Sequence, residues 1–195
     1  MGAAAMLALL ALHFAGGASA ETASRTDMVP HALVLDAGKS RVTFHVRTRW
    51  GQRIVGHLPV AGGERRILAD GRHQVRMVLD ATAADLEGSG RMDEVARGER
   101  FFDAGEHPRI VFLSDPYHAS MVEQGGVIQG WLEIRGVRRP EVFILEPASC
   151  AEPGTGCAVN ARGSIDRSAY GMDAMRLVLS GNVHFDLHLW LGPAP

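Results

Sequence analysis

Three side chains that can bind a metal ion stand at alternate positions near the C-terminal end of the chain: His184, Asp186 and His188. Residues two apart project from the same face of a β-strand, so these side chains could hold zinc if a fourth ligand came from elsewhere. The residues that alternate with them are all apolar: Val183, Phe185, Leu187 and Leu189. A strand of this kind turns its apolar face to the core and its polar face to solvent. The pattern therefore favours a solvent-facing strand surface over a metal-dependent active site.

A second group of charged residues, Asp166 and Arg167, lies directly before the segment from Ser168 to Met172. At the mouth of a ligand cavity, a guanidinium in this place could contact a phosphate or a quinone carbonyl. An internal ion pair between the two side chains, which would fix the turn, is an equally good interpretation. The sequence leaves both interpretations open.

No motif of a known class of enzyme accompanies these residues. The chain contains no His-Glu-x-x-His, no Gly-x-Ser-x-Gly and no phosphate-binding loop, and Gly88-x-Gly90 lacks the third glycine of a dinucleotide site. His45 and His57 are more simply explained as polar residues on strand faces. We therefore expect no catalytic residue, no metal and no cofactor.

The composition points to a single globular domain. The chain has 195 residues, of which 46% are apolar and 22% charged, which allows one hydrophobic core. The formal net charge is -2 and charges of both signs are interspersed, so a surface for nucleic acid is not expected.

Alternation of apolar and polar residues with a period of two runs through the chain. In the first clear example, Val42, Phe44 and Val46 alternate with polar residues, as in a half-buried strand. The alternation recurs at Val75-Met77-Leu79, Ile110-Phe112, Ile128-Leu132-Ile134, Val142-Ile144 and Val183-Phe185-Leu187-Leu189. Glycine-rich joints separate these strands and favour antiparallel hairpins. The pattern predicts an all-β barrel or sandwich.

One segment has helical rather than strand spacing. Between Arg91 and Arg97, the apolar residues Met92, Val95 and Ala96 fall on one helix face behind Ser89, which can serve as an N-cap. The sequence predicts one short helix there.

The first 20 residues are typical of a secretory signal peptide. An apolar run from Ala3 to Phe14 is followed by Gly16-Gly17 and then by Ala18-Ser19-Ala20, which fits the small residues before a cleavage site. The run is shorter than the roughly 18 residues that a membrane span requires. We expect cleavage after Ala20, a polar leader at 21–32 and a domain at 33–195. The mature protein would be periplasmic or secreted, without stable membrane insertion.

Two cysteines, Cys150 and Cys157, bracket a turn that contains Pro153, Gly154 and Gly156. Such a turn can bring the two side chains into bonding range, and an oxidising compartment would pair them. Closing this loop would stabilise the fold by roughly 2.5 kcal/mol in the chain-entropy model. The spacing does not match a metal or redox pair, so a disulfide is expected.

Several short motifs follow one another along the chain. They are Leu35-Asp36, Ser40-x-Val42-x-Phe44, Val55-Gly56-x-Leu58, Phe101-Phe102-Asp103, His107-Pro108-x-Ile110-x-Phe112-x-Ser114, Gly130-x-Leu132-x-Ile134-x-Gly136-Val137 and Ile165-Asp166-Arg167-Ser168-x-Tyr170-Gly171-Met172. Together they resemble the YceI-like family of periplasmic lipid-binding proteins, from about Leu33 to about Leu189. The chain departs from the family pattern at Val34-Leu35, at 91–95, and at Pro59 to Gly71, which is unusually rich in Arg and Gly.

The resemblance implies an antiparallel, lipocalin-like β-barrel of about eight strands, a width that allows one slender ligand inside. It also implies a non-catalytic protein whose partner is an isoprenoid-type lipid, such as a polyisoprenoid or an isoprenoid quinone. Monomers and homodimers both occur among barrels of this composition.

The inward-facing residues of such a barrel would form an apolar wall. Each buried methylene of a guest would contribute about 0.8 kcal/mol. The residues expected to line the interior are Phe44, Val46, Met77, Phe101, Phe102, Phe112, Leu132, Ile134, Tyr170, Met172, Phe185 and Leu187, with Asp166 and Arg167 as possible head-group contacts. The alternative is a filled core in a protein that acts through its surface, for example through Trp50, Trp131 or Trp190. The residues alone favour the filled core, whereas the resemblance favours the ligand.

Overall fold

The structure is a computed structural model that describes residues 33–88 and 90–193. The expected signal peptide at 1–20, the leader at 21–32 and Ser89 lie outside the described residues. Within the described ranges, no helix is both long enough and apolar enough to span a membrane.

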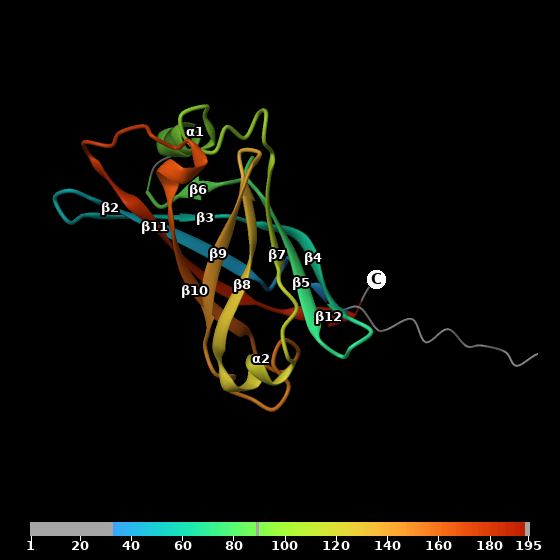
Figure 1. Cartoon of the computed structure of the whole chain (residues 1–195). Coiled ribbons are helices and arrows are strands. Elements are labelled where there is room, and N and C mark those ends of the chain that lie inside the picture. Colours follow the sequence, from blue (N-terminus) through green and yellow to red (C-terminus); the bar gives the residue numbers. More distant parts are fainter. Residues whose placement is uncertain (1–32, 89, 194–195) are drawn as a thin grey trace, which may run out of the picture.

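The regular structure of the described chain consists mainly of antiparallel strands, with two short helices and one 3₁₀ turn (Figure 1). The strands are β1 (Leu33–Leu35), β2 (Arg41–Thr48), β3 (Arg53–His57), β4 (Val60–Ile67), β5 (His73–Asp80), β6 (Asp85–Leu86), β7 (Arg109–Ser114), β8 (Gly126–Ile134), β9 (Val137–Leu145), β10 (Val159–Asp166), β11 (Leu179–Leu189) and β12 (Leu191–Pro193). The helices are α1 (Gly90–Arg97) and α2 (Ser120–Gln124), and the 3₁₀ turn is η1 (Arg167–Tyr170).

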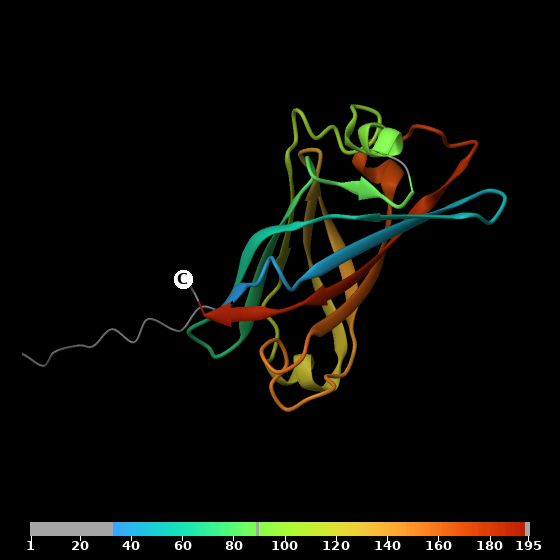
Figure 2. The same ribbon diagram turned by 180° about the vertical axis from the view of Figure 1, so that it is seen from behind.

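The strands form one sheet that closes on itself. Three pairs of strands, β1 with β2, β3 with β4, and β11 with β12, follow one another with only a short break and run on in the same direction round the barrel (Figure 2). The β11–β12 segment pairs with β2 and β1, and the β3–β4 segment pairs with the other edge of β2 and β1. The ladder then continues through β5, β7, β8, β9 and β10 back to β11. The barrel wall thus consists of eight continuous segments, as the resemblance implies. The three breaks divide these segments into 11 strands, and the short β6, which pairs with β3, is the twelfth strand of the sheet.

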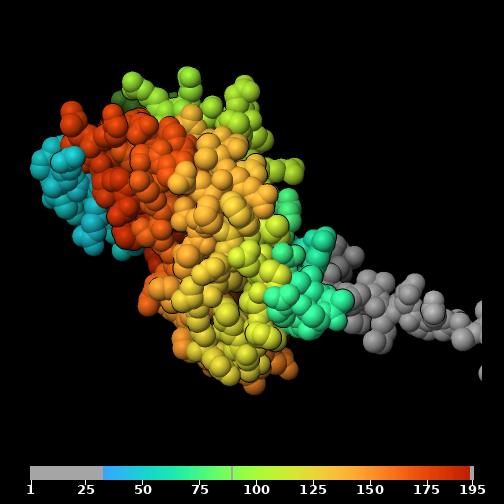
Figure 3. All heavy atoms as spheres, viewed as in Figure 1, coloured from blue at the N-terminus to red at the C-terminus, as the bar shows by residue number. Residues whose placement is uncertain are grey.

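Alternation of burial follows the predicted period along most strands. In β11, Val183, Phe185 and Leu187 are buried, whereas Asp186 and His188 are exposed and His184 is half-buried. The strand β9 is an exception. Val142 and Ile144 are 48% and 45% exposed, and it is Phe143 and Leu145 that face the core. The strand was predicted, but the apolar pair of the prediction lies on its outer face. In Figure 3, β8 and β9 (yellow and orange) form much of the near surface.

The two helices cover opposite ends of the barrel (Figure 1). The helix α1 matches the predicted helix and lies at one end, beside η1 and the segment that follows it. The helix α2 lies at the other end and was not predicted, because its five residues are too few to show a helical period.

The loop after β9 contains the expected disulfide. Cys150 and Cys157 are bonded, with their Cα atoms 6.0 Å apart. Of the three tryptophans expected at the surface, Trp50 is 73% exposed and Trp131 41% exposed. Trp190, which was also expected to be exposed, is half-buried; it lies between β11 and β12, where its backbone N–H donates to Ser40 Oγ at 2.9 Å.

Candidate ligand cavity

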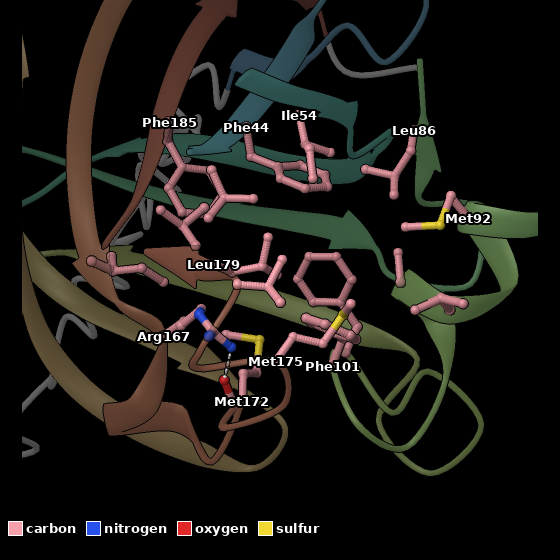
Figure 4. Close-up of a pocket in the computed structure, with 17 residues that line it drawn as sticks. Phe44, Ile54, Leu86, Met92, Phe101, Arg167, Met172, Met175, Leu179 and Phe185 are labelled. Carbon is pink, nitrogen blue, oxygen red and sulfur yellow. Dashed lines mark hydrogen bonds between the residues drawn. The ribbon is translucent and has the colours of Figure 1, made fainter. Parts of the chain in front are cut away.

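A cavity of about 110 Å³ lies at the α1 end of the barrel, between the strand wall and the segments that cover this end. Figure 4 shows the side chains of β2, β3 and β11 on one side and, on the other, those of α1 and of the loop segments that contain Phe101, Met172 and Met175. The surface that these residues present to the cavity is wholly apolar. The lining residues are Phe44, Val46, Ile54, Leu86, Met92, Val95, Ala96, Phe101, Phe102, Ile165, Arg167, Met172, Met175, Val178, Leu179, Val183 and Phe185.

Phe44 is positioned by the alternation of β2 and by a glycine on the neighbouring strand. Gly56 of β3 lies opposite Phe44, and a Cβ at this position would stand 2.4 Å from the Cζ atom of the Phe44 ring. Only glycine leaves room for the ring to lie over β3. The ring then packs against Phe185 of β11 and Phe102, with centroids 6.4 Å and 5.5 Å away.

The cover over the cavity is held to the barrel by polar contacts. In α1, Asp93 Oδ1 accepts from the backbone N–H of Leu86 at 2.7 Å, and Arg97 Nε donates to Ala84 O at 2.6 Å. On the other side, Nη1 of Arg135 donates to Phe101 O and to Gly171 O, each at 3.0 Å. We call α1, the segment 98–104 and the segment 171–178 the cap. Arg135 therefore joins the two loop segments of the cap at one point.

The cavity reaches the surface through the cap. Val95 and Met175 line the cavity and are also 38% and 45% exposed. Three of the cap residues that line it are methionines: Met92, Met172 and Met175. Unbranched thioether side chains rearrange easily and fill spaces of different shape. The cap is therefore the most adaptable part of the wall.

Among the described residues, Arg167 is the only charged one in the cavity wall, and its donors are directed at backbone carbonyls. It is 3% exposed, and it donates from Nε to Ser180 O at 2.9 Å and from Nη1 to Met172 O and to Ala174 O, the latter at 2.8 Å. Burial lowers the pKa of Arg167 from its usual value, against the opposing effect of the nearby carboxylates. Arg167 thus fixes the segment 172–180 to the barrel.

Asp166, unlike Arg167, forms its hydrogen bonds with the turn that directly follows it. Its Oδ1 atom accepts from the backbone N–H of Ser168 at 2.9 Å and from Ser168 Oγ at 2.7 Å, and so caps η1. These hydrogen bonds lower the pKa of Asp166. The ion pair considered from the sequence is not formed, because the charged atoms of Asp166 and Arg167 do not lie within 4.0 Å of each other. Both side chains bind the turn itself, and the contact with a ligand head group stays a prediction.

The cavity brings together half of the twelve apolar residues expected in the interior. The six are Phe44, Val46, Phe101, Phe102, Met172 and Phe185. The other six, Met77, Phe112, Leu132, Ile134, Tyr170 and Leu187, are buried outside its wall. The middle of the barrel is filled, for example by the edge-to-face packing of Phe112 on Phe143 at 5.1 Å. The interior is therefore open at the α1 end of the barrel, as the resemblance suggests, and filled in its middle, as the residues alone suggest.

Tyr170 is buried completely and does not line the cavity. The hydroxyl donates to Oε1 of Glu141 at 2.8 Å. Burial, followed by the hydrogen bond to Glu141 and its charge, raises the pKa of Tyr170 far above the usual range.

Ten lining residues were not expected from the sequence. Most of them lie on the cap or beside it, such as Leu86, Met92, Met175 and Val178. For three of them, Met92, Val95 and Ala96, the sequence did contain a signal, because they form the apolar face of the predicted helix. The segment 172–179 has no period that reports which side chains turn inward.

The residues with metal-binding chemistry lie on the outer face, as the alternation of β11 predicts. The imidazole of His184 stacks on that of His45 with centroids 4.9 Å apart, and His188 Nδ1 forms a hydrogen bond of 2.8 Å with Asn160 Oδ1. Asp186 lies 3.8 Å from Arg53. Desolvation, and then the charge of Arg53, lower the pKa of His45. Over residues 33–88 and 90–193, no three His, Cys, Asp or Glu side chains are grouped so that they could hold a metal.

Residues 33–190 match the family model described as the YceI-like domain. The chain belongs to the YceI-like family. The match covers the barrel from β1 to β11 and the cap, so the cavity described above is part of the family domain. A search of curated proteins finds no match to this YceI-like chain.

Solved structures share the fold of this YceI-like protein at low sequence identity. BcnA of Burkholderia cenocepacia has a TM-score of 0.60 and 18% identity over 81% of this chain and 99% of BcnA. A polyisoprenoid binding domain from Saccharophagus degradans, implicated in plant cell wall breakdown, has a TM-score of 0.61 and 14% identity over 84% of this chain and 99% of that domain. A mutant YceI protein crystallised with a monobromobimane guest has a TM-score of 0.51 and 17% identity over 68% of this chain and 80% of that protein. At these identities the likeness concerns the fold.

Proposed function

We propose that this YceI-like protein binds an elongated apolar lipid, of polyisoprenoid or isoprenoid-quinone type, at the α1 end of the barrel and catalyses no reaction on it. The observation that carries the proposal is the wholly apolar cavity under the cap. A site without a free polar group selects its ligand by shape and apolar area. The polyisoprenoid binding domain from Saccharophagus degradans has the same fold, which supports this choice of ligand class.

The size of the cavity indicates how the ligand is accommodated. A cavity of about 150 Å³ in a protein core holds one benzene molecule. The cavity of about 110 Å³ therefore holds only one end of a long chain. The filled middle of the barrel blocks further entry in that direction, so the cap must move outward to extend the cavity. The methionines at 92, 172 and 175 make such a rearrangement possible without leaving gaps in the apolar wall.

The energetics require no polar contact. Each buried methylene of the guest contributes about 0.8 kcal/mol. About ten such groups offset the several kcal/mol that association and the ordering of the chain cost. The length of the buried chain would then be the main determinant of affinity.

We also propose that the protein works outside the cytoplasm, after cleavage behind Ala20. The disulfide between Cys150 and Cys157 supports this location, because such bonds persist in oxidising compartments. The domain would then begin at about residue 33, after the leader.

The test is to express the full chain with its own N-terminus, purify it from the periplasm, extract it with organic solvent and identify the extract by mass spectrometry. We expect a prenyl lipid in near-stoichiometric amount. The variant Ala96→Phe places a ring in the cavity and should purify without lipid, because Ala96 faces the cavity from α1. Its matched control is Glu94→Phe, which adds the same ring on the exposed side of the helix and should keep the lipid. Wild-type protein that carries no lipid and takes up none from prenyl-lipid vesicles would refute the proposal.

A further inference from the structure

A second, larger cavity of about 300 Å³ lies at the opposite end of the barrel, near α2. Its walls come from β1, β4, β5 and the β10–β12 region, and the loop that carries the disulfide closes one side. Figure 2 shows α2 and this loop (yellow and orange) at the end remote from α1. A volume of this size is at the lower end of the range for small-molecule pockets.

Arg65 points into this cavity. In β4 it pairs with Val75 of β5 and with Leu33 of β1, and all three side chains line the cavity. Its neighbours Glu64 and Arg66 form an ion pair with each other. Arg65 therefore occupies a position that barrel strands normally give to an apolar residue, since it faces the interior.

The guanidinium of Arg65 has no acidic partner. Its Nε atom is buried and has no hydrogen-bond acceptor, and no carboxylate of the described chain lies within 4.0 Å of its nitrogens. A buried donor without an acceptor is rare in native proteins. The Nε atom of Arg65 therefore lacks an oxygen acceptor, and a charged oxygen would form the strongest hydrogen bond with it.

His73 adds a second unpartnered polar atom in the same cavity. Its Nδ1 atom is buried without a hydrogen-bond partner, and its ring lies 6.0 Å from that of Tyr117 in edge-to-face contact. Desolvation, and then the charge of Arg65, lower the pKa of His73, which favours the neutral imidazole. With its proton on Nδ1, a neutral imidazole is a hydrogen-bond donor that lacks an acceptor here.

The rest of the wall is mainly apolar. Leu35, Val159 and Leu191 lie across the cavity from β5. Two carboxylates, Glu123 and Glu152, also border it, but both residues are exposed and belong to the rim. The cavity thus combines two lining residues that carry unpartnered nitrogen atoms with a mainly apolar wall, as a site for an amphiphile requires.

We propose that this second cavity binds a short amphiphile with an oxyanion head, whose head accepts hydrogen bonds from Arg65 and His73 and whose tail lies against Leu35, Val159 and Leu191. The site is separate from the cavity at the α1 end and goes beyond the proposed function, because it selects its ligand by charge. A carboxylate or a phosphate monoester satisfies the geometry equally, since each offers two or more acceptor oxygens to a guanidinium. The acidic rim residues turn toward solvent and do not neutralise Arg65.

The test is calorimetric titration of the purified full chain with decanoate, decyl phosphate, 1-decanol and decyltrimethylammonium. We expect one of the two oxyanions, or both, to bind at least roughly tenfold more tightly than the alcohol and the cation, as a charge-assisted hydrogen bond gives. The ratio of the two oxyanion affinities then identifies the preferred head. Equal binding of decanol, or tighter binding of the cation at the acidic rim, would overturn the proposal without any variant.

Matched variants locate the site. Arg65→Met should weaken oxyanion binding by roughly ten- to a hundredfold, and Arg65→Lys should restore part of it. The neighbouring Arg66→Met removes a positive charge from the outer face and should change nothing. Ala96→Phe fills the other cavity and should also leave this titration unchanged, so failure at one site is distinguishable from failure at the other. Unaltered affinity in folded Arg65→Met protein would rule out the role of Arg65.

Discussion

The ring of Phe102 meets the ring of Phe44 edge to face, with centroids 5.5 Å apart and planes at 88°. Phe44 belongs to the rigid wall of the barrel, because β2 pairs on both edges. Phe102 belongs to the cap, where its backbone N–H donates to Ala96 O at 3.0 Å. This contact joins the two parts of the cavity wall, so it must be broken or shifted when the cap moves away from the barrel.

The first prediction concerns the energy of this contact. Aromatic pairs of this geometry are worth about 1 kcal/mol beyond the area that they bury. A double-mutant cycle with Phe44→Leu and Phe102→Leu should give a coupling energy of about this size in urea unfolding. The same pair of changes should also raise the exchange rate of amide protons in the cap. If the two substitutions were additive, the contact between Phe44 and Phe102 would contribute nothing to holding the cap on the barrel.

The second prediction separates a structural from a ligand-binding role of Arg167. Replacing Arg167 by Met removes the donors of three backbone carbonyls, those of Met172, Ala174 and Ser180. Because Arg167 is 3% exposed, water cannot readily replace it, and the free energy of unfolding should fall by about 3 kcal/mol.

Arg167→Lys is the control for that experiment. An ammonium keeps the charge but cannot reach three carbonyls in the fixed geometry of a guanidinium, so its loss of stability should be intermediate. Each variant that folds should co-purify with the same amount of lipid as the wild-type protein. A variant with wild-type stability that loses the lipid would instead show that the guanidinium contacts the ligand.

The strands of this protein could be predicted from the sequence because the alternation of β2 and β11 is unambiguous. The facing of β9 could not be predicted. Its residues Val142, Phe143, Ile144 and Leu145 are apolar on both faces, so a period of two does not tell which pair turns inward. The sequence could also not predict that Arg65 faces the interior, because this residue stands between two other charged residues, Glu64 and Arg66.

The cavities were harder to predict than the barrel. Whether an inward-facing residue such as Phe112 lines a space or fills it depends on the side chain opposite, here Phe143, which comes from a strand that pairs with neither edge of β7. Sequence periodicity describes one strand at a time and contains no information on such distant contacts. The loop segment at 172–179 has no periodicity at all, although Met175 and Val178 complete the cavity at the α1 end.

The third prediction concerns stability at alkaline pH and the two tyrosines of the chain. The pKa of Tyr170 is raised by burial and then by the hydrogen bond and charge of Glu141. The pKa of Tyr117 is raised by burial, and the charge of Arg65 opposes the shift only in part. In the unfolded chain both hydroxyls ionise near pH 10. Above that pH the unfolded state therefore releases protons that the folded state retains, and stability falls as pH rises.

Each tyrosine that stays protonated in the folded state contributes a decline of about 1.4 kcal/mol per pH unit above pH 10. Urea unfolding between pH 9 and pH 11 should show this decline, and it should be shallower in Tyr170→Phe. That variant should also be less stable at pH 7 by about 1 to 2 kcal/mol, since Glu141 loses a partly buried hydrogen bond. Tyrosinate absorbance at pH 10 should appear only with unfolding. Absorbance from both tyrosines in protein that is still folded would contradict the environment described for them, because a hydroxyl that ionises at its usual pKa can be neither deeply buried nor held by a carboxylate.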